Sequence, residues 1–207
     1  MFDLSQLQKQ LNLKTKIGII GEEQATKAAV LIPLIKKDGE WELLFEMRSL
    51  KLKNQPGDIC FPGGKQEASD DNLQHTAVRE TSEELGIPTT SIQVLGPLDL
   101  YIPSSRIIIY PYVGMIHTLD FQISQDEVDE IFTIPMSWLL EIQPDVHSIL
   151  FNPQPSEDFP YERIALGKEH EWRPSQIDEL FYHYGHHSIW GITARILQHF
   201  ISVIKTN

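Results

Sequence analysis

Apolar residues form two short runs near the start of the chain, over residues 28–35 and 41–47. Both runs are rich in the aliphatic and aromatic residues that β-sheets favour. Asp38-Gly39 lies between them, and an Asp-Gly pair between two such runs is typical of a tight hairpin. The pattern therefore predicts two adjacent antiparallel strands.

Helical spacing and helix-ending residues mark three further segments. Gly86 and Pro88 follow a candidate helix at the point where its apolar spacing ends. Ser5 and Ser188 stand at or near the first residue of the other two, where a hydroxyl can accept a backbone N–H. The sequence thus predicts helices over residues 4–13, 72–85 and 188–204.

The remaining apolar runs predict short strands and one short helix. Pro111 has no backbone N–H, so its strand is expected at a sheet edge or at a bulge. Pro62-Gly63-Gly64 is expected to be a turn, and residues 143–160, rich in Pro and Asp, a surface excursion. The predicted strands cover residues 57–61, 92–101, 107–117 and 131–134, and the predicted helix covers 135–142.

Strands outnumber helices in the middle of the chain, which favours a mixed α+β fold over a doubly wound parallel sheet. The length of 207 residues fits one enlarged domain. We therefore expect a single domain over residues 1–207, with a short N-terminal helix and a helical extension at the C-terminus.

Charge narrows the classes of partner. The chain has 17 Lys and Arg against 29 Asp and Glu, a formal net charge of −12. This balance argues against a nucleic-acid polymer and against an anionic membrane, because both need clustered cations. A small anionic substrate stays open if a divalent metal neutralises the local carboxylates.

Cys60 is the single cysteine, so the chain has no internal disulfide. We expect a buried structural thiol in a protein of the reducing cytoplasm. The first residues show no secretory signal, and no apolar stretch approaches the ~18 residues of a membrane helix. The sequence leaves the oligomeric state open, a homodimer included.

The helix predicted over residues 72–85 carries an acidic cluster. At ~100° per residue, Glu80, Glu83 and Glu84 fall on one face of it, with Val78 and Leu85 roughly opposite. Like charges at these spacings repel one another, and oxygen-rich clusters are what Mg²⁺ or Mn²⁺ requires. The alternative interpretation is a solvated acidic face.

These residues resemble the box of the Nudix hydrolases. Gly64, Arg79-Glu80, Glu83-Glu84 and Gly86-Ile87 match its fixed positions. The box loop is one residue longer than the general pattern, Asp70 or Asp71 replaces its usual Glu, and Thr81 occupies an apolar position. The resemblance implies an α+β fold of the Nudix type, an α/β/α sandwich with a mixed β-sheet.

Upstream residues resemble the signature of the Nudix subgroup that hydrolyses coenzyme A. Here one extra residue precedes Arg48, and Lys53 replaces an Arg, which keeps the charge but loses the bidentate geometry. Residues 189–194 are similar to the C-terminal helix of that subgroup. The residues that carry the signature are Leu43-Leu44, Arg48-Ser49, Lys53, Gly57 and Phe61-Pro62-Gly63-Gly64.

The resemblance implies metal-dependent hydrolysis of the pyrophosphate of coenzyme A or its derivatives, giving 4′-phosphopantetheine and adenosine 3′,5′-bisphosphate. It implies Glu83 and Glu84 as Mg²⁺ or Mn²⁺ ligands, Glu80 as a ligand or base, and the Gly63 carbonyl as a backbone ligand. Arg79 would support the carboxylates through a salt bridge. The alternatives are another nucleoside diphosphate derivative (ADP-ribose, a dinucleotide or an NTP) and a non-catalytic nucleotide-sensing module.

Residues outside the box complete the expected site. Glu127 is the first candidate for a distal base and Glu130 the second, the alternative being a solvated acidic loop. Arg48 and Lys53 are candidates to hold the nucleotide phosphates, and Arg106 is a weaker one. Residues 182–187 contain three histidines whose spacing matches no closed zinc site, so we expect a partly packed aromatic segment.

Overall fold

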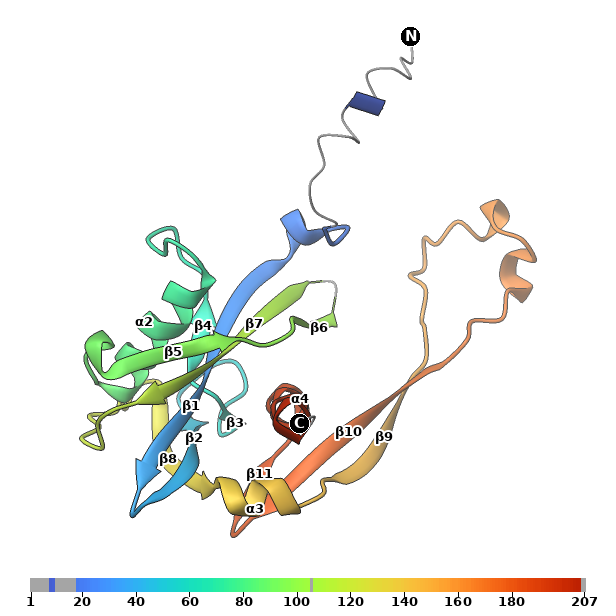
Figure 1. Ribbon diagram of the computed structural model, residues 1–207. Helices are drawn as coiled ribbons and strands as arrows, with labels where there is room; N and C mark the ends of the chain where they lie inside the picture. The colour runs from blue at the N-terminus through green and yellow to red at the C-terminus, as the bar shows by residue number, and fades with distance from the viewer. Residues whose placement is uncertain (1–7, 10–17, 105, 206–207) are drawn as a thin grey trace.

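A computed structural model of the chain describes residues 8–9, 18–104 and 106–205 (Figure 1). Its larger sheet has eight strands, with the path β3-β2-β1-β7-β5. The sheet is mixed, because β1 pairs parallel to β7 and antiparallel to β2. The strands are β1 (Thr26–Lys37), β2 (Glu40–Arg48), β3 (Ile59–Cys60), β4 (Gly63–Lys65), β5 (Ile92–Pro97), β6 (Tyr101–Ser104), β7 (Ile107–Ile116) and β8 (Val128–Pro135).

The first hairpin is as predicted. β1 and β2 run antiparallel and their last pair is Lys37 with Glu40. The two residues between them have positive φ, 49° at Asp38 and 90° at Gly39. An Asp-Gly pair adopts that conformation readily, and the resulting turn matches the twist of the strands.

Two helices cover the two faces of the sheet (Figure 1). Strand alternation in β1 sends Ala29 and Leu31 toward Ala77 of α2 (Leu73–Leu85). Ile32 points to the other face and packs in the cluster that includes Leu197 of α4 (Gly191–Lys205). The predicted α+β sandwich with a mixed sheet is confirmed.

Helix α2 begins and ends where its capping residues predict. The Asn72 side chain accepts a hydrogen bond from the backbone N–H of His75 at 3.0 Å. Gly86 adopts the left-handed conformation at φ 62°, and the N–H of Ile87 then reaches the carbonyl of Ser82. These caps fix the register of the helix that carries the acidic residues.

One expectation about loops was wrong, and a second, although right about exposure at the surface, missed a strand. Gly63 and Gly64 do not form a turn but the short strand β4, which pairs with Val30 and Ala29 of β1. The sheet, and not the local sequence, decides their conformation. Residues 145–151, placed in a surface excursion, form β9 (Asp145–Phe151), because they find a pairing partner in β10 (Ser175–Tyr184).

Three further boundaries differ from the prediction. The strand predicted over residues 92–101 is divided into β5 and β6, which both pair with β7. Pro111 lies in β7, inside the sheet, opposite the break between β5 and β6. Its missing N–H therefore falls where the pairing is interrupted. The C-terminal helix begins at Gly191, and Ser188 belongs to β11 (His187–Ile189) instead of capping it. The helix predicted over 4–13 lies, apart from residues 8 and 9, outside the described residues.

A β-arm extends away from the sandwich (Figure 1). It is the ribbon β9–β10, which continues into β11, and all seven residues of β9 are exposed. Helix α3 (Met136–Glu141) leads into it. The single-turn helices are η1 (Glu22–Gln24), η2 (Thr89–Ser91), η3 (Tyr161–Arg163) and η4 (Gly167–Glu169). Within the described ranges, no helix is long and apolar enough to span a bilayer.

Gly86 tests the cap of α2. A Cβ atom at Gly86 would lie 2.0 Å from the backbone oxygen of Gln122, whereas one at Gly185 would meet nothing within 4 Å. Both glycines have similar positive φ, so Gly185→Ala isolates the backbone strain, about 1 kcal/mol. Gly86→Ala adds the steric clash, and we expect a loss of about 3 kcal/mol in urea unfolding. Equal losses for the two variants would contradict this account of the cap.

Candidate active site

The three acidic residues of α2 differ sharply in exposure. Glu84 is 4% exposed, the Glu80 side chain 18% and the Glu83 side chain 56%. Glu80 and Glu84 line a hollow of about 740 Å³, whereas Glu83 does not. The predicted acidic face therefore lies partly beneath the surface. The hollow is lined by Ala28, Arg48, Leu52, Lys53, Asn54, Gln55, Gly63, Gly64, Lys65, Glu67, Glu80, Glu84 and Glu127.

Arg79 organises the outer side of this hollow. Its Nε lies 2.8 Å from Oδ1 of Asp70, and it also contacts Glu80 and Glu83, each at 3.0 Å. The Arg79 hydrogen bonds hold the pKa of Asp70 well below its usual range. Asp70 thus fills the place of the usual box Glu as the partner of Arg79. The predicted supporting salt bridge is present, and it holds Glu83 at the rim.

The strand β4 brings backbone close to the buried carboxylates. The N–H of Gly63 donates a 2.8 Å hydrogen bond to Oε2 of Glu84. A Cβ atom at Gly64 would lie 2.4 Å from the carboxyl carbon of Glu80. At Gly63 a Cβ atom would lie 2.3 Å from the backbone oxygen of Ala29, so this position requires glycine, whereas at Gly64 the Glu80 side chain would have to move.

Burial and mutual repulsion change the titration of these acids. Burial and then the charge of Glu46 raise the pKa of Glu84 well above its ordinary value, against the Gly63 hydrogen bond. Burial also raises the pKa of Glu80, while Arg79 opposes the rise. Carboxylates that are costly to ionise without a counter-charge are suited to a cation.

Glu46 was missed by the sequence reasoning. It is fully buried in β2, pairs across the sheet with Cys60, and accepts a hydrogen bond from the Cys60 thiol at 3.2 Å. Burial raises its pKa to about 7, and its second oxygen has no hydrogen-bond partner among the described residues. The sequence did contain a signal for this burial. Glu46 follows Leu44 by two residues, so both side chains point to the same face of β2, and that face is covered by α2.

Cys60 behaves as a buried thiol and not as a nucleophile. Burial, followed by the negative charge of Glu46, raises its pKa well above the ordinary value. The thiol form that this favours can donate the hydrogen bond to Glu46.

The predicted residues outside the box separate into two groups. Arg48, Lys53 and Glu127 line the same hollow as Glu80 and Glu84. Arg106 is exposed at the turn before β7 and is not part of that lining. Glu130 is held elsewhere, 3.2 Å from the Nε2 of His187.

The surroundings of Glu130 explain its separation from the box. His187 stacks on Phe132, with ring centroids 3.7 Å apart, within the cluster on the α4 face. Glu130, His186 and His187 are the one set of three candidate ligands within 4.8 Å of one another in the described residues. His187 is already packed and hydrogen-bonded to Glu130, as expected for a partly packed aromatic segment. Glu130 is thereby separated from the acids of α2.

The donor set of the hollow fits a hard divalent cation. It offers the carboxylates of Glu80, Glu84 and Glu127 together with the backbone at Gly63. Oxygen ligands of this type suit Mg²⁺ or Mn²⁺ better than softer metals. Arg79 contacts one carboxylate oxygen of Glu80 and one of Glu83, each at 3.0 Å, which leaves the other oxygen of each carboxylate for a cation.

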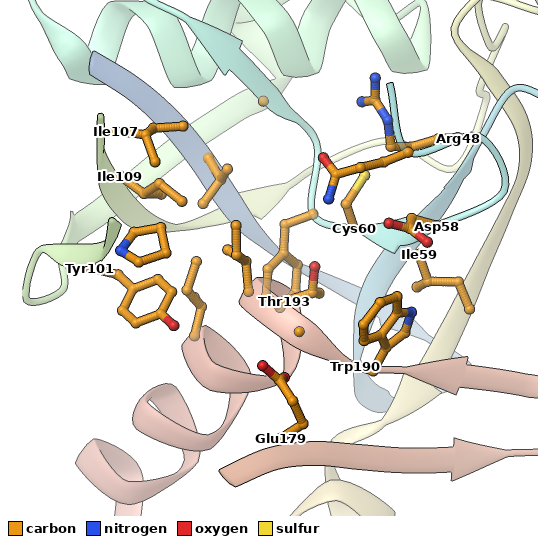
Figure 2. Close-up of a pocket in the computed structure, with 18 of the residues that line it drawn as sticks. Arg48, Asp58, Ile59, Cys60, Tyr101, Ile107, Ile109, Glu179, Trp190 and Thr193 are labelled. Atoms are coloured by element: carbon orange, nitrogen blue, oxygen red, sulfur yellow. The ribbon is translucent and has the colours of Figure 1, made fainter. Parts of the chain in front are cut away.

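A second hollow, of about 440 Å³, adjoins the first and shares Arg48, Gln55 and Gly63 with it (Figure 2). It lies on the α4 side of the sheet and has mainly apolar walls, including Ile107 and Ile109. Together the two hollows place a charged compartment beside an apolar one. That combination suits a ligand with an anionic part and an organic part.

The comparisons with known proteins agree with this geometry. The NUDIX domain family model matches residues 25–152. A peroxisomal coenzyme A diphosphatase of Mus musculus is 38% identical over 58% of this chain and 51% of its own length. A mitochondrial coenzyme A diphosphatase of Homo sapiens is 33% identical over 83% of this chain and 66% of its own. The matched segment thus spans about half to two thirds of those relatives.

A bacterial relative aligns over most of both chains. The uncharacterized Nudix hydrolase NudL of Photorhabdus laumondii is 33% identical over 82% of this chain and 80% of its own length. The likeness therefore extends beyond the box and includes sequence on both sides of it.

Glu46 generates a prediction about pH. Its folded pKa, about 7, lies above its ordinary value of 4.5, so between these values the folded state binds more protons than the unfolded state. In EDTA, the contribution of Glu46 to the free energy of unfolding is therefore fully present below about pH 4.5, and it is lost as the pH rises through 7. The loss due to Glu46 is on the order of 3 kcal/mol.

Glu46→Gln keeps the shape and removes the ionisation. We expect its unfolding free energy in urea, at pH 8 in EDTA, to exceed that of the wild type, with the two proteins converging near pH 4.5. Glu141→Gln removes the same charge at an exposed position on α3 and is the matched control. Its unfolding free energy at pH 8 should equal that of the wild type. A wild-type-like pH profile for Glu46→Gln would refute the assigned titration.

Proposed function

This chain belongs to the NUDIX domain family, and on that premise we propose that it hydrolyses the pyrophosphate bond of coenzyme A or one of its derivatives. The products would be 4′-phosphopantetheine and adenosine 3′,5′-bisphosphate. The observation that carries the proposal is one hollow that combines the acids Glu80 and Glu84 with the cations Arg48 and Lys53. The two coenzyme A diphosphatases among its relatives support the choice of substrate.

Each residue then has a chemical task. Glu80 and Glu84 would hold Mg²⁺ or Mn²⁺, joined by Glu83 at the rim of the hollow. The metal, when bound, would neutralise charge on the pyrophosphate and make water a better nucleophile. Arg48 and Lys53 would attract the phosphate oxygens, with Lys53 acting as a point charge.

Glu127 is the proposed base. It comes from the segment before β8, outside the box, and lines the same hollow as Glu80 and Glu84. A carboxylate within reach of the attacking water can accept its proton as the new P–O bond forms. Its backbone carbonyl accepts from the N–H of Ser49 at 2.8 Å, which ties this segment to the end of β2.

The cellular setting is proposed from the composition of the chain. The low cysteine content favours a reducing compartment, and we propose the cytoplasm. The net charge of −12 favours small-molecule substrates over nucleic acid or anionic membranes as partners.

Substrate profiling tests the proposal. Purified protein with Mn²⁺ is incubated with coenzyme A, acetyl-coenzyme A, ADP-ribose and a diadenosine polyphosphate, and the products are identified by mass spectrometry. We expect 4′-phosphopantetheine and adenosine 3′,5′-bisphosphate from coenzyme A, with the highest kcat/KM among these substrates or shared with its thioester. Brisk turnover of ADP-ribose alone would reject coenzyme A but keep the hydrolase chemistry, and no turnover of any would favour a sensing module.

The box acids are tested by removing one charge at a time. Glu84→Gln and Glu83→Gln should each lower kcat by about 100-fold or more, because a ligand for the cation is lost. Glu84→Gln should also raise stability in EDTA, since it replaces a buried carboxyl that is costly to ionise. Glu141→Gln again serves as the charge control. Unchanged activity in Glu84→Gln would eliminate its proposed role as a ligand.

A further inference from the structure

Two acidic residues, Asp58 and Glu179, line the apolar hollow, and the proposed chemistry of the pyrophosphate uses neither. Glu179 projects from β10 into this hollow, at the end away from Arg48 (Figure 2). Its Oε2 atom is buried and has no hydrogen-bond partner among the described residues. Glu179 also makes no ion pair within the described part of the chain. A buried acceptor without a donor is rare in native proteins, and a ligand is one explanation for it.

The walls around Glu179 restrict what that ligand can be. Tyr101 and Trp190 lie on either side of it, and Thr193 of α4 lies above it (Figure 2). The aromatic walls suit a flat or extended organic group, whereas the carboxylate repels phosphate. Phosphate therefore belongs at the Arg48 end of the two hollows, and a donor of hydrogen bonds at the Glu179 end.

We propose that Glu179 accepts a hydrogen bond from an N–H group in the organic part of the substrate and thereby selects that part. The inference rests on the proposed function, and it assigns to Glu179 the selection of the organic part of the substrate. In coenzyme A two sources carry such a donor: the amino group of the adenine and the amides of the pantetheine chain. Both could enter the Glu179 end of this hollow, whose walls are mainly apolar.

The variants Glu179→Ala and Glu179→Gln test this assignment. With coenzyme A and Mn²⁺, Glu179→Ala should raise KM at least tenfold, with little change in kcat, because binding is lost and the reacting groups are untouched. Glu179→Gln keeps an acceptor oxygen and should raise KM less. Asp178→Asn removes a charge from the next residue of β10, on the opposite face of the ribbon, and should leave KM unchanged.

Stability provides a second readout that separates binding from a structural role. If the buried oxygen of Glu179 gains a partner only when a ligand binds, Glu179→Gln and Glu179→Ala should unfold at the same temperature as the wild type or higher. If Glu179 supports the fold, both variants should melt earlier. Wild-type KM in both variants, or a higher KM together with a lower melting temperature in both, would overturn the inference.

Two substrate analogues identify the source of the N–H group. Replacing the adenine of coenzyme A by unsubstituted purine removes the amino group without adding a ring N–H, and ADP-ribose removes the pantetheine. If the amino group is the donor, Glu179→Ala should lose its effect on the purine analogue but keep it on ADP-ribose; the reverse identifies the pantetheine amides. If the wild type fails to hydrolyse coenzyme A but hydrolyses ADP-ribose, the proposed function fails, whereas the ADP-ribose comparison still tests Glu179.

Discussion

Repulsion among buried carboxylates is the constraint on which the rest of the site depends. Glu46 and Glu84 lie between β2 and α2, and the charges of Glu80 and Glu127 act on both. Without a counter-charge these groups are neutral or unstable, so their pKa values rise. Arg79 is already committed to Asp70, and it neutralises only the outer part of the cluster. A divalent cation meets the remaining need, and that need links the fold to the proposed chemistry.

The sandwich places two different environments side by side. The α2 face supplies acids, and the α4 face, with β10, supplies apolar walls. Gly63 and Arg48 lie where the two hollows meet. A substrate with a pyrophosphate beside an organic group would be held across this junction, so that specificity and hydrolysis are assigned to opposite faces of one sheet.

Local signals in the sequence predicted the hairpin at Asp38-Gly39 and the end of α2 at Gly86, because each depends on neighbours only a few residues away. Long-range pairing defeated the same reasoning at Gly63-Gly64 and in β9. The cluster of Glu80, Glu83 and Glu84 was predicted from helical spacing, and the supporting role of Arg79 from the resemblance to the Nudix box. Glu46 and Glu179 were not predicted as site residues. Their burial depends on which helix or hollow covers each strand, and the tertiary structure decides that.

Calorimetric titration of the EDTA-treated protein with Mn²⁺ tests the central claim most directly. At pH 6.5, in two buffers with different ionisation enthalpies, the apparent binding enthalpy reports how many protons leave when the metal binds. The account predicts proton release in the wild type and a smaller release, with weaker binding, in Glu84→Gln, since cation and proton compete for the same buried carboxylates. Binding of Mn²⁺ with no proton release, or no binding at all, would contradict it.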